Sequence, residues 1–123
     1  MSGGKDQGGF RAASREVCII TLIHARKHHE DQVKEALLTV TLAARSDEGC
    51  ISYELHQDVH DSTTFILYEN WRSKEDVERH MATDRIRHFL SRADLLASPA
   101  MEPHVADRIG IPSVKTCKVS IGI

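Results

Sequence analysis

Two runs of alternating side chains lie on either side of a polar turn in residues 50–71, which read CISYELHQDVHDSTTFILYENW. In the first run, Ile51, Tyr53 and Leu55 are expected to face one way, with polar residues between them. The second run alternates in the same manner from Thr63 to Trp71. This pattern predicts an antiparallel β-hairpin.

The segments that flank the hairpin predict one more strand before it and helices on both sides of it. Residues 16–24, EVCIITLIH, are β-branched and nearly all apolar, which is typical of a central strand covered on both faces. Residues 30–45 carry an apolar stripe at three- and four-residue spacing and predict a helix. A second helical segment is expected after Ser73, which resembles a capping box with Asp76, and a break is expected at Thr83.

Extended segments after Ser98, at residues 101–105 and 113–123, are the candidate final strands. The resulting β-α-β-β-α-β order predicts an α+β fold of the ferredoxin-like kind, with an antiparallel sheet and helices on one face. Two strands of that sheet are apolar on both sides, and the chain's own helices cover only one side. We therefore expect a homodimer in which a second copy of the sheet covers the other face.

The chain divides into three parts by composition. Residues 1–15 are rich in glycine and predict a flexible leader, and residues 16–105 hold the regular elements. We expect the C-terminal extension, residues 106–123, to pack on the partner subunit.

Charge and cysteine content restrict the class of protein. The net charge of −2 predicts no nucleic-acid partner, and the longest apolar run is too short to span a membrane. Three widely spaced cysteines form neither a disulfide framework nor a CxxC pair, and the N-terminus does not resemble a signal peptide. A cytoplasmic location is the expectation.

A carboxylate on the second hairpin strand is the first candidate for chemistry. Glu69 is expected to point the same way as Leu67 and Trp71, into an apolar layer, where a carboxylate must be paired or protonated. His80, on the inner face of the following helix, is the predicted partner. A carboxylate beside an imidazole suits general-base catalysis near neutral pH, although a purely structural pair would have the same sequence pattern.

The other histidines and motifs point to no metal or nucleotide. His56 and His60 lie at a strand end and in a turn, so their spacing does not place both rings on one helical face, and we predict no metal site. No nucleotide-binding, serine-hydrolase or zinc-protease motif occurs in the sequence.

The motifs Glu48-Gly49-Cys50, Glu69-Asn70-Trp71 and His80 together resemble the antibiotic biosynthesis monooxygenase family, over residues 17–105. The resemblance implies a dimeric ferredoxin-like α+β barrel. Many members of that family carry Thr-Pro-His shortly after the first histidine, whereas this chain reads Thr83-Asp84-Arg85. An arginine in the pocket would favour a more anionic substrate. Haem degradation is disfavoured, because the first strand has no asparagine and the single tryptophan lies on a strand.

The resemblance further implies a monooxygenase that needs no cofactor and oxidises an electron-rich aromatic, a quinol or a polyketide phenol, with dioxygen. His80 would act as base or proton shuttle and Glu69 as the group that orients it. The expected substrate-binding residues are Tyr53, Phe65, Leu67, Trp71, His24, Phe89 and Arg85.

Two other functions remain open on the sequence. One is isomerisation of a small phosphorylated sugar signal, with Arg85 or Arg87 holding the phosphate. The other is a dimeric ligand-binding module in which Glu69 and His80 only stabilise the fold.

Overall fold

The computed structural model describes residues 16–107 and 109, and these form four strands and three helices. In chain order the elements are β1 (Val17–Ala25), α2 (Glu30–Ala44), β2 (Cys50–Gln57), β3 (Thr64–Trp71), α3 (Lys74–Met81), α4 (Asp84–Leu90) and β4 (Leu96–Asp107). The predicted leader, residues 1–15, and the candidate strand at 113–123 lie outside the described residues, as does most of the C-terminal extension.

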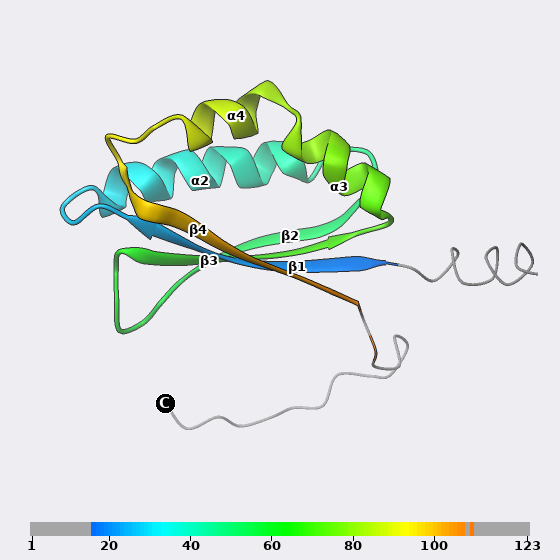
Figure 1. The fold of residues 1–123 in the computed structure, drawn as a ribbon, viewed down its shortest axis with the longest axis horizontal. Coiled ribbons are helices and arrows are strands. Elements are labelled where there is room, and N and C mark those ends of the chain that lie inside the picture. The colour runs from blue at the N-terminus through cyan, green and yellow to red at the C-terminus, as the bar shows by residue number, and fades with distance from the viewer. Residues whose placement is uncertain (1–15, 108, 110–123) are drawn as a thin grey trace, which may run out of the picture.

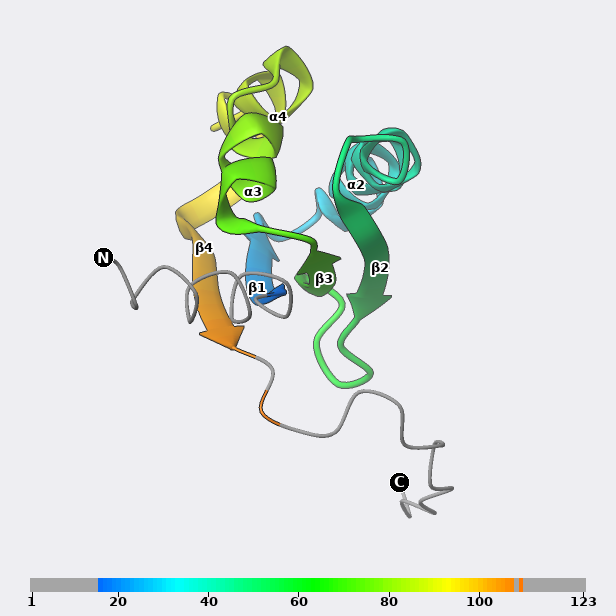
Figure 2. The ribbon, with the colours of Figure 1, turned by 90° about the vertical axis from the view of Figure 1, so that its right-hand side faces the viewer.

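The four strands form one antiparallel sheet in the order β2-β3-β1-β4. All three helices lie on the same face of this sheet, with α2 beside α3 and α4 (Figures 1 and 2). This arrangement confirms the predicted ferredoxin-like α+β fold.

The helices form where the sequence supplies an apolar stripe and a cap. In α2, Val33, Leu37 and Val40 recur at the spacing that places them on one face, and all three are buried. The helix α3 begins at a capping box, since the Ser73 hydroxyl accepts a hydrogen bond from the Asp76 amide, at 3.2 Å.

The two faces of the central strands, β1 and β3, differ in burial. Side chains on the helix-facing side of β1 and β3, among them Ile19, Ile23, Phe65 and Leu67, are buried in the core. On the opposite side, Ile20 keeps 38% of its surface exposed. The described residues therefore cover only one face of the sheet.

The structure corrects the prediction at two strand positions. The pairing of β2 with β3 shifts between Cys50 and Ser52, so the intervening Ile51 is a bulge residue and turns outward, 51% exposed. Ile51 thus faces away from Tyr53, which is buried. The last strand also begins earlier than expected, at Leu96, because its first residue pairs with Ala25.

Candidate active site

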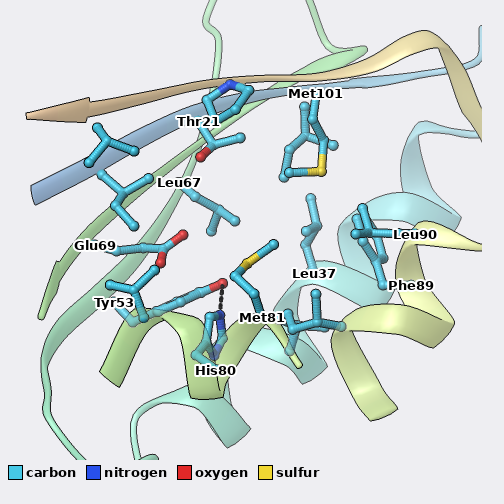
Figure 3. A pocket seen from close by; sticks show the side chains of 17 residues that line it. Thr21, Leu37, Tyr53, Leu67, Glu69, His80, Met81, Phe89, Leu90 and Met101 are labelled. Carbon is cyan, nitrogen blue, oxygen red and sulfur yellow. Dashed lines mark hydrogen bonds between the residues drawn. The ribbon is translucent and has the colours of Figure 1, made fainter. Parts of the chain in front are cut away.

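An apolar cavity of about 180 Å³ lies between the helices and the sheet (Figure 3). Every described helix and strand contributes to its wall. The apolar lining comes from Ile19, Ile23, Leu37, Val40, Leu67, Val77, Met81, Ile86, Phe89, Leu90, Met101, Pro103 and Val105. Met81, Leu90, Pro103 and Val105 are the exposed residues among these.

Four lining residues bring polar groups into this apolar space. They are Thr21 from β1, Tyr53 from β2, Glu69 from β3 and His80 from α3. A small number of polar groups that converge in an apolar cavity is the usual form of a small-molecule site. In Figure 3 the Tyr53 hydroxyl, the Glu69 carboxyl and the His80 ring lie close together at one end of the cavity.

Glu69 keeps its carboxyl group inside the apolar layer, as the strand periodicity predicts, with only 5% of the residue exposed. One oxygen accepts a hydrogen bond from Trp71 Nε1 at 2.8 Å. Burial raises the Glu69 pKa to about 7, although the Trp71 and Tyr53 hydrogen bonds act in the opposite direction. Near neutral pH this carboxyl group therefore exchanges readily between its acidic and basic forms.

His80 is held on both sides of its ring. Its Nδ1 lies 2.9 Å from Asp47 Oδ2, and its Nε2 lies 3.4 Å from the Tyr53 hydroxyl. Burial lowers the His80 pKa, while the hydrogen bond and charge of Asp47 raise it. The Trp71 ring packs against the imidazole, with 4.7 Å between centroids.

The protonation states follow from these contacts. Burial tends to raise the Asp47 pKa, but the hydrogen bonds from Arg85 and His80 outweigh it, and the net pKa is lowered. An ionised carboxylate accepts hydrogen bonds only, so the neutral His80 ring carries its proton on Nδ1. Its Nε2 lone pair then faces the Tyr53 hydroxyl, whose single proton has two acceptors within reach, this nitrogen and the Glu69 carboxylate. Burial and the Glu69 charge raise the Tyr53 pKa.

The predicted direct pairing of Glu69 with His80 is therefore replaced by a bridged one. Tyr53 contacts both groups, and the carboxylate that orients His80 is Asp47, from the loop after α2. Asp47 was not among the predicted site residues, because the segment before Gly49 has the pattern of an ordinary turn. The signal in the sequence was a pair of acidic residues, Asp47 and Glu48, directly before that glycine.

Gly49 is required for this loop to approach α3. Its φ of +82° lies in the left-handed region, and a Cβ atom there would lie 2.2 Å from Asp76 Cγ. Asp76 in turn is bound by Arg72 and Arg79 and by the Ser73 hydroxyl. The absence of a side chain at Gly49 lets the loop that bears Asp47 pack against the helix that bears His80.

The remaining predicted site residues divide between the cavity and its surroundings. Tyr53, Leu67 and Phe89 line the cavity together with Glu69 and His80. Phe65 is buried in the core. Trp71 donates a hydrogen bond to Glu69 and packs against the His80 ring. Neither Phe65 nor Trp71 lines the cavity.

Two predicted residues lie elsewhere. His24 lies on the open side of the sheet, where it binds Glu102 at 2.7 Å and Thr64 at 3.3 Å. Arg85 donates a hydrogen bond to Asp47 Oδ1 and is not a lining residue. The expected preference for an anionic substrate therefore has no support from the position of Arg85.

Among the described residues, no group of three or more His, Cys, Asp and Glu side chains is placed to hold a metal ion. Cys18 and Cys50 are free thiols, and Cys117 lies outside the described residues. Within the same part of the chain, no helix has the length and apolarity needed to cross a bilayer.

The model of one protein family matches residues 16–92, and its description is antibiotic biosynthesis monooxygenase. The chain is 36% identical over 58 residues to the uncharacterised protein sll1783 of Synechocystis, a match that covers 46% of this chain and 40% of that protein. It is 28% identical over 57 residues to YcnE, a candidate monooxygenase of Bacillus subtilis, covering 46% of this chain and 60% of YcnE. The chain thus matches less than two thirds of either relative.

A solved structure is similar to this chain over more of its length. PA3566 from Pseudomonas aeruginosa superposes with a TM-score of 0.74 and 29% sequence identity. This match covers 80% of this chain and 98% of PA3566.

Proposed function

The chain belongs to the antibiotic biosynthesis monooxygenase family, and on that premise we propose that it is a monooxygenase that oxidises a small electron-rich phenol or hydroquinone with dioxygen and without a cofactor. The observation that carries the proposal is the convergence of Tyr53, Glu69 and His80 in one apolar cavity. The apolar wall suits an aromatic ring, and the polar end suits its hydroxyl group.

The size of the cavity favours a ligand with one ring. A cavity of about 150 Å³ is known to hold benzene, and this one measures about 180 Å³. Within the predicted substrate class, a single-ring quinol is therefore the better fit than a polycyclic phenol.

In the proposed reaction the substrate supplies the electrons. Glu69 removes the proton from the ligand hydroxyl, and the electron pair of that O–H bond stays on the ligand oxygen. The resulting anion reduces dioxygen and combines with it at a ring carbon to form a hydroperoxide, which loses water. For a hydroquinone the products are one hydroxyquinone and one water for each dioxygen consumed.

The protein's contribution is a water-poor space with few, fixed polar groups. Glu69 acts as base, while His80, joined to it through Tyr53, shuttles the proton. Leu67 and Phe89 hold the ring. Trp71 positions Glu69 through its indole hydrogen bond.

The phosphorylated-sugar alternative lacks a cation in the cavity. None of the described residues that line the cavity is lysine or arginine, and the Arg85 guanidinium donates a hydrogen bond to Asp47 outside it. A phosphate group would add negative charge beside Glu69. We therefore rank isomerisation of a sugar phosphate below oxidation of a neutral aromatic.

We also propose that the molecule is a homodimer. The open side of the sheet presents Ile20 and Leu22 of β1 beside Tyr68 and Ile66 of β3, in direct register. An apolar strip between polar edge strands is suited to a second copy of the same face. Packing of the C-terminal extension on the partner and a cytoplasmic location stay predictions.

The test is oxygen consumption by purified protein with a panel of single-ring hydroquinones. We expect Glu69→Gln and His80→Ala to lower kcat/KM by about 100-fold or more. The matched control is His88→Ala, an exposed histidine on α4 that does not line the cavity. Wild-type kcat/KM should rise with pH around an apparent pKa of about 7, as Glu69 ionises.

Three outcomes would contradict the proposal. No oxygen uptake with any hydroquinone would argue for one of the other two functions, and binding of sugar phosphates without oxygen use would favour the isomerase. Equal activity in His80→Ala and His88→Ala, with both folded by circular dichroism, would remove His80 from the site.

A further inference from the structure

His80 lies in the wall between two hollows of different character. One is the apolar cavity described above. The other is a charged surface hollow lined by Asp47, Glu48, Asp76, Arg79, His80 and Thr83. His80 is the one residue that lines both. Its Nε2 faces the Tyr53 hydroxyl and its Nδ1 faces Asp47, so the two ring nitrogens are assigned to opposite sides of this wall.

We infer that Asp47 is a positioning residue that fixes the His80 tautomer. Beside it, Glu69, Tyr53 and His80 form a proton relay. The relay moves a positive charge out of the apolar cavity to the side of the His80 ring that faces Asp47. The inference deepens the proposed function and rests on it for the source of the proton. The relay itself rests on contacts that are present without a ligand.

The steps conserve one proton. The ligand O–H bond breaks and an O–H bond forms on Glu69. That proton then passes to the Tyr53 oxygen while the original Tyr53 proton forms an N–H bond at Nε2 of His80. The ring becomes an imidazolium opposite the Asp47 carboxylate, and no electron leaves the side chains. The same proton returns along the path when the hydroperoxide releases water.

Asp47 is suited to this role because both of its oxygens are engaged. Oδ1 accepts from Arg85, which keeps the carboxylate ionised and in place, and Oδ2 accepts from Nδ1 of His80. This directs the Nε2 lone pair toward Tyr53. Without Asp47, the ring is free to adopt the other tautomer, in which Nε2 carries the proton and cannot accept one.

The charged and titratable groups around His80 come from four neighbouring segments. They are Asp47 in the loop before β2, Tyr53 on β2, Arg85 on α4 and, through Tyr53, Glu69 on β3. Asp47 favours the imidazolium form, whereas Arg85 and burial oppose it. The balance keeps His80 neutral at rest and able to accept a proton.

The first test is nitrogen NMR of the His80 ring, which needs no substrate. In wild-type protein at pH 8 we expect the neutral tautomer with the proton on Nδ1. In Asp47→Asn we expect this preference to be lost and the His80 pKa to fall by about one to three pH units, since an opposite charge has been removed. The matched control is Glu48→Gln, the neighbouring exposed carboxylate, which should leave both signals unchanged.

The second test separates the relay from a structural role. With an active hydroquinone, Asp47→Asn and Tyr53→Phe should lower kcat by at least about tenfold with little change in KM, whereas Glu48→Gln should keep wild-type kinetics. A merely structural Asp47 would lower thermal stability and leave the tautomer and the pH profile as they are.

The outcomes for the two proposals are distinguishable. A wild-type tautomer with the proton on Nε2, or an Asp47→Asn variant with unchanged tautomer and pKa, overturns this inference even if oxygen is consumed. Failure of every hydroquinone, with the NMR signals responding as expected, contradicts the monooxygenase proposal and supports the positioning role of Asp47. The wild-type measurement decides the tautomer even if Asp47→Asn does not fold.

Discussion

At the level of a single residue, burial of the Glu69 carboxyl group lowers the stability of the fold at alkaline pH. Its pKa rises from 4.5 to about 7 on burial, so the folded protein holds the proton more tightly than the unfolded chain does. The stabilisation from this group is fully present below pH 4.5 and is lost as the pH rises through about 7. At alkaline pH the loss amounts to about 3 kcal/mol.

Glu69→Gln should therefore stabilise the protein at alkaline pH while it lowers activity. Glutamine keeps an oxygen for the Trp71 hydrogen bond and has no charge to bury. We expect the difference in unfolding free energy between variant and wild type to grow by about 2 to 3 kcal/mol between pH 5 and pH 8. Urea denaturation at the two pH values measures it.

The control for this change is Glu78→Gln, an exposed glutamate on α3. Its stability difference from wild type should stay the same at both pH values. If the difference in unfolding free energy between Glu69→Gln and wild type were the same at both pH values, the Glu69 pKa would not be raised. Gain of stability with loss of activity in one variant is the pattern expected of a functional residue.

At the level of elements, α3 matters most because it carries His80. It has only eight residues, too few to be stable alone, and depends on its contacts with the rest of the fold. The Ser73 hydroxyl accepts from the Asp76 amide and donates to the Asp76 carboxylate at 2.7 Å. Arg72 binds the same carboxylate through two nitrogens, both at 3.0 Å.

Ser73→Ala should lower stability by about 1 kcal/mol, because it removes the N-cap of α3. In the Ser73→Ala variant, the amide protons of α3 should also exchange with solvent faster than those of α2. Thermal unfolding and hydrogen exchange measure the two effects. Ser73→Thr keeps the hydroxyl group and should restore most of the loss, and equal losses in both variants would contradict the capping role.

At the level of the whole molecule, the open face of the sheet controls assembly. The row across the sheet that contains Ile20 runs from His104 on β4 through Tyr68 on β3 to Glu54 on β2. Its centre is apolar and its ends are polar, as in an interface with a buried middle and a wet rim.

Ile20→Lys should dissociate the proposed dimer, because it places a charge at the centre of the apolar strip. Light scattering after gel filtration should give the mass of one chain for the variant and of two for wild type. Leu42→Lys is the matched control, since Leu42 is 65% exposed on α2 and lies away from the sheet. A wild-type monomer, or a dimer that survives Ile20→Lys, would contradict this interface.

Much of the fold was predictable from local patterns. The alternation in residues 50–71 predicts β2 and β3, and the Ser73 cap predicts the start of α3, because side-chain period and capping are properties of short segments. The bulge at Ile51 was not predictable, since it depends on how β2 pairs with β3.

For the candidate site, periodicity by itself determined that Glu69 and His80 face the same interior. Only the tertiary structure decided which group contacts which. Tyr53 bridges the two, Asp47 takes the place expected for Glu69, and Arg85 turns away from the cavity. The physical reason is that periodicity gives the direction of a side chain along one element, whereas a hydrogen bond depends on the distance between elements that only their packing sets.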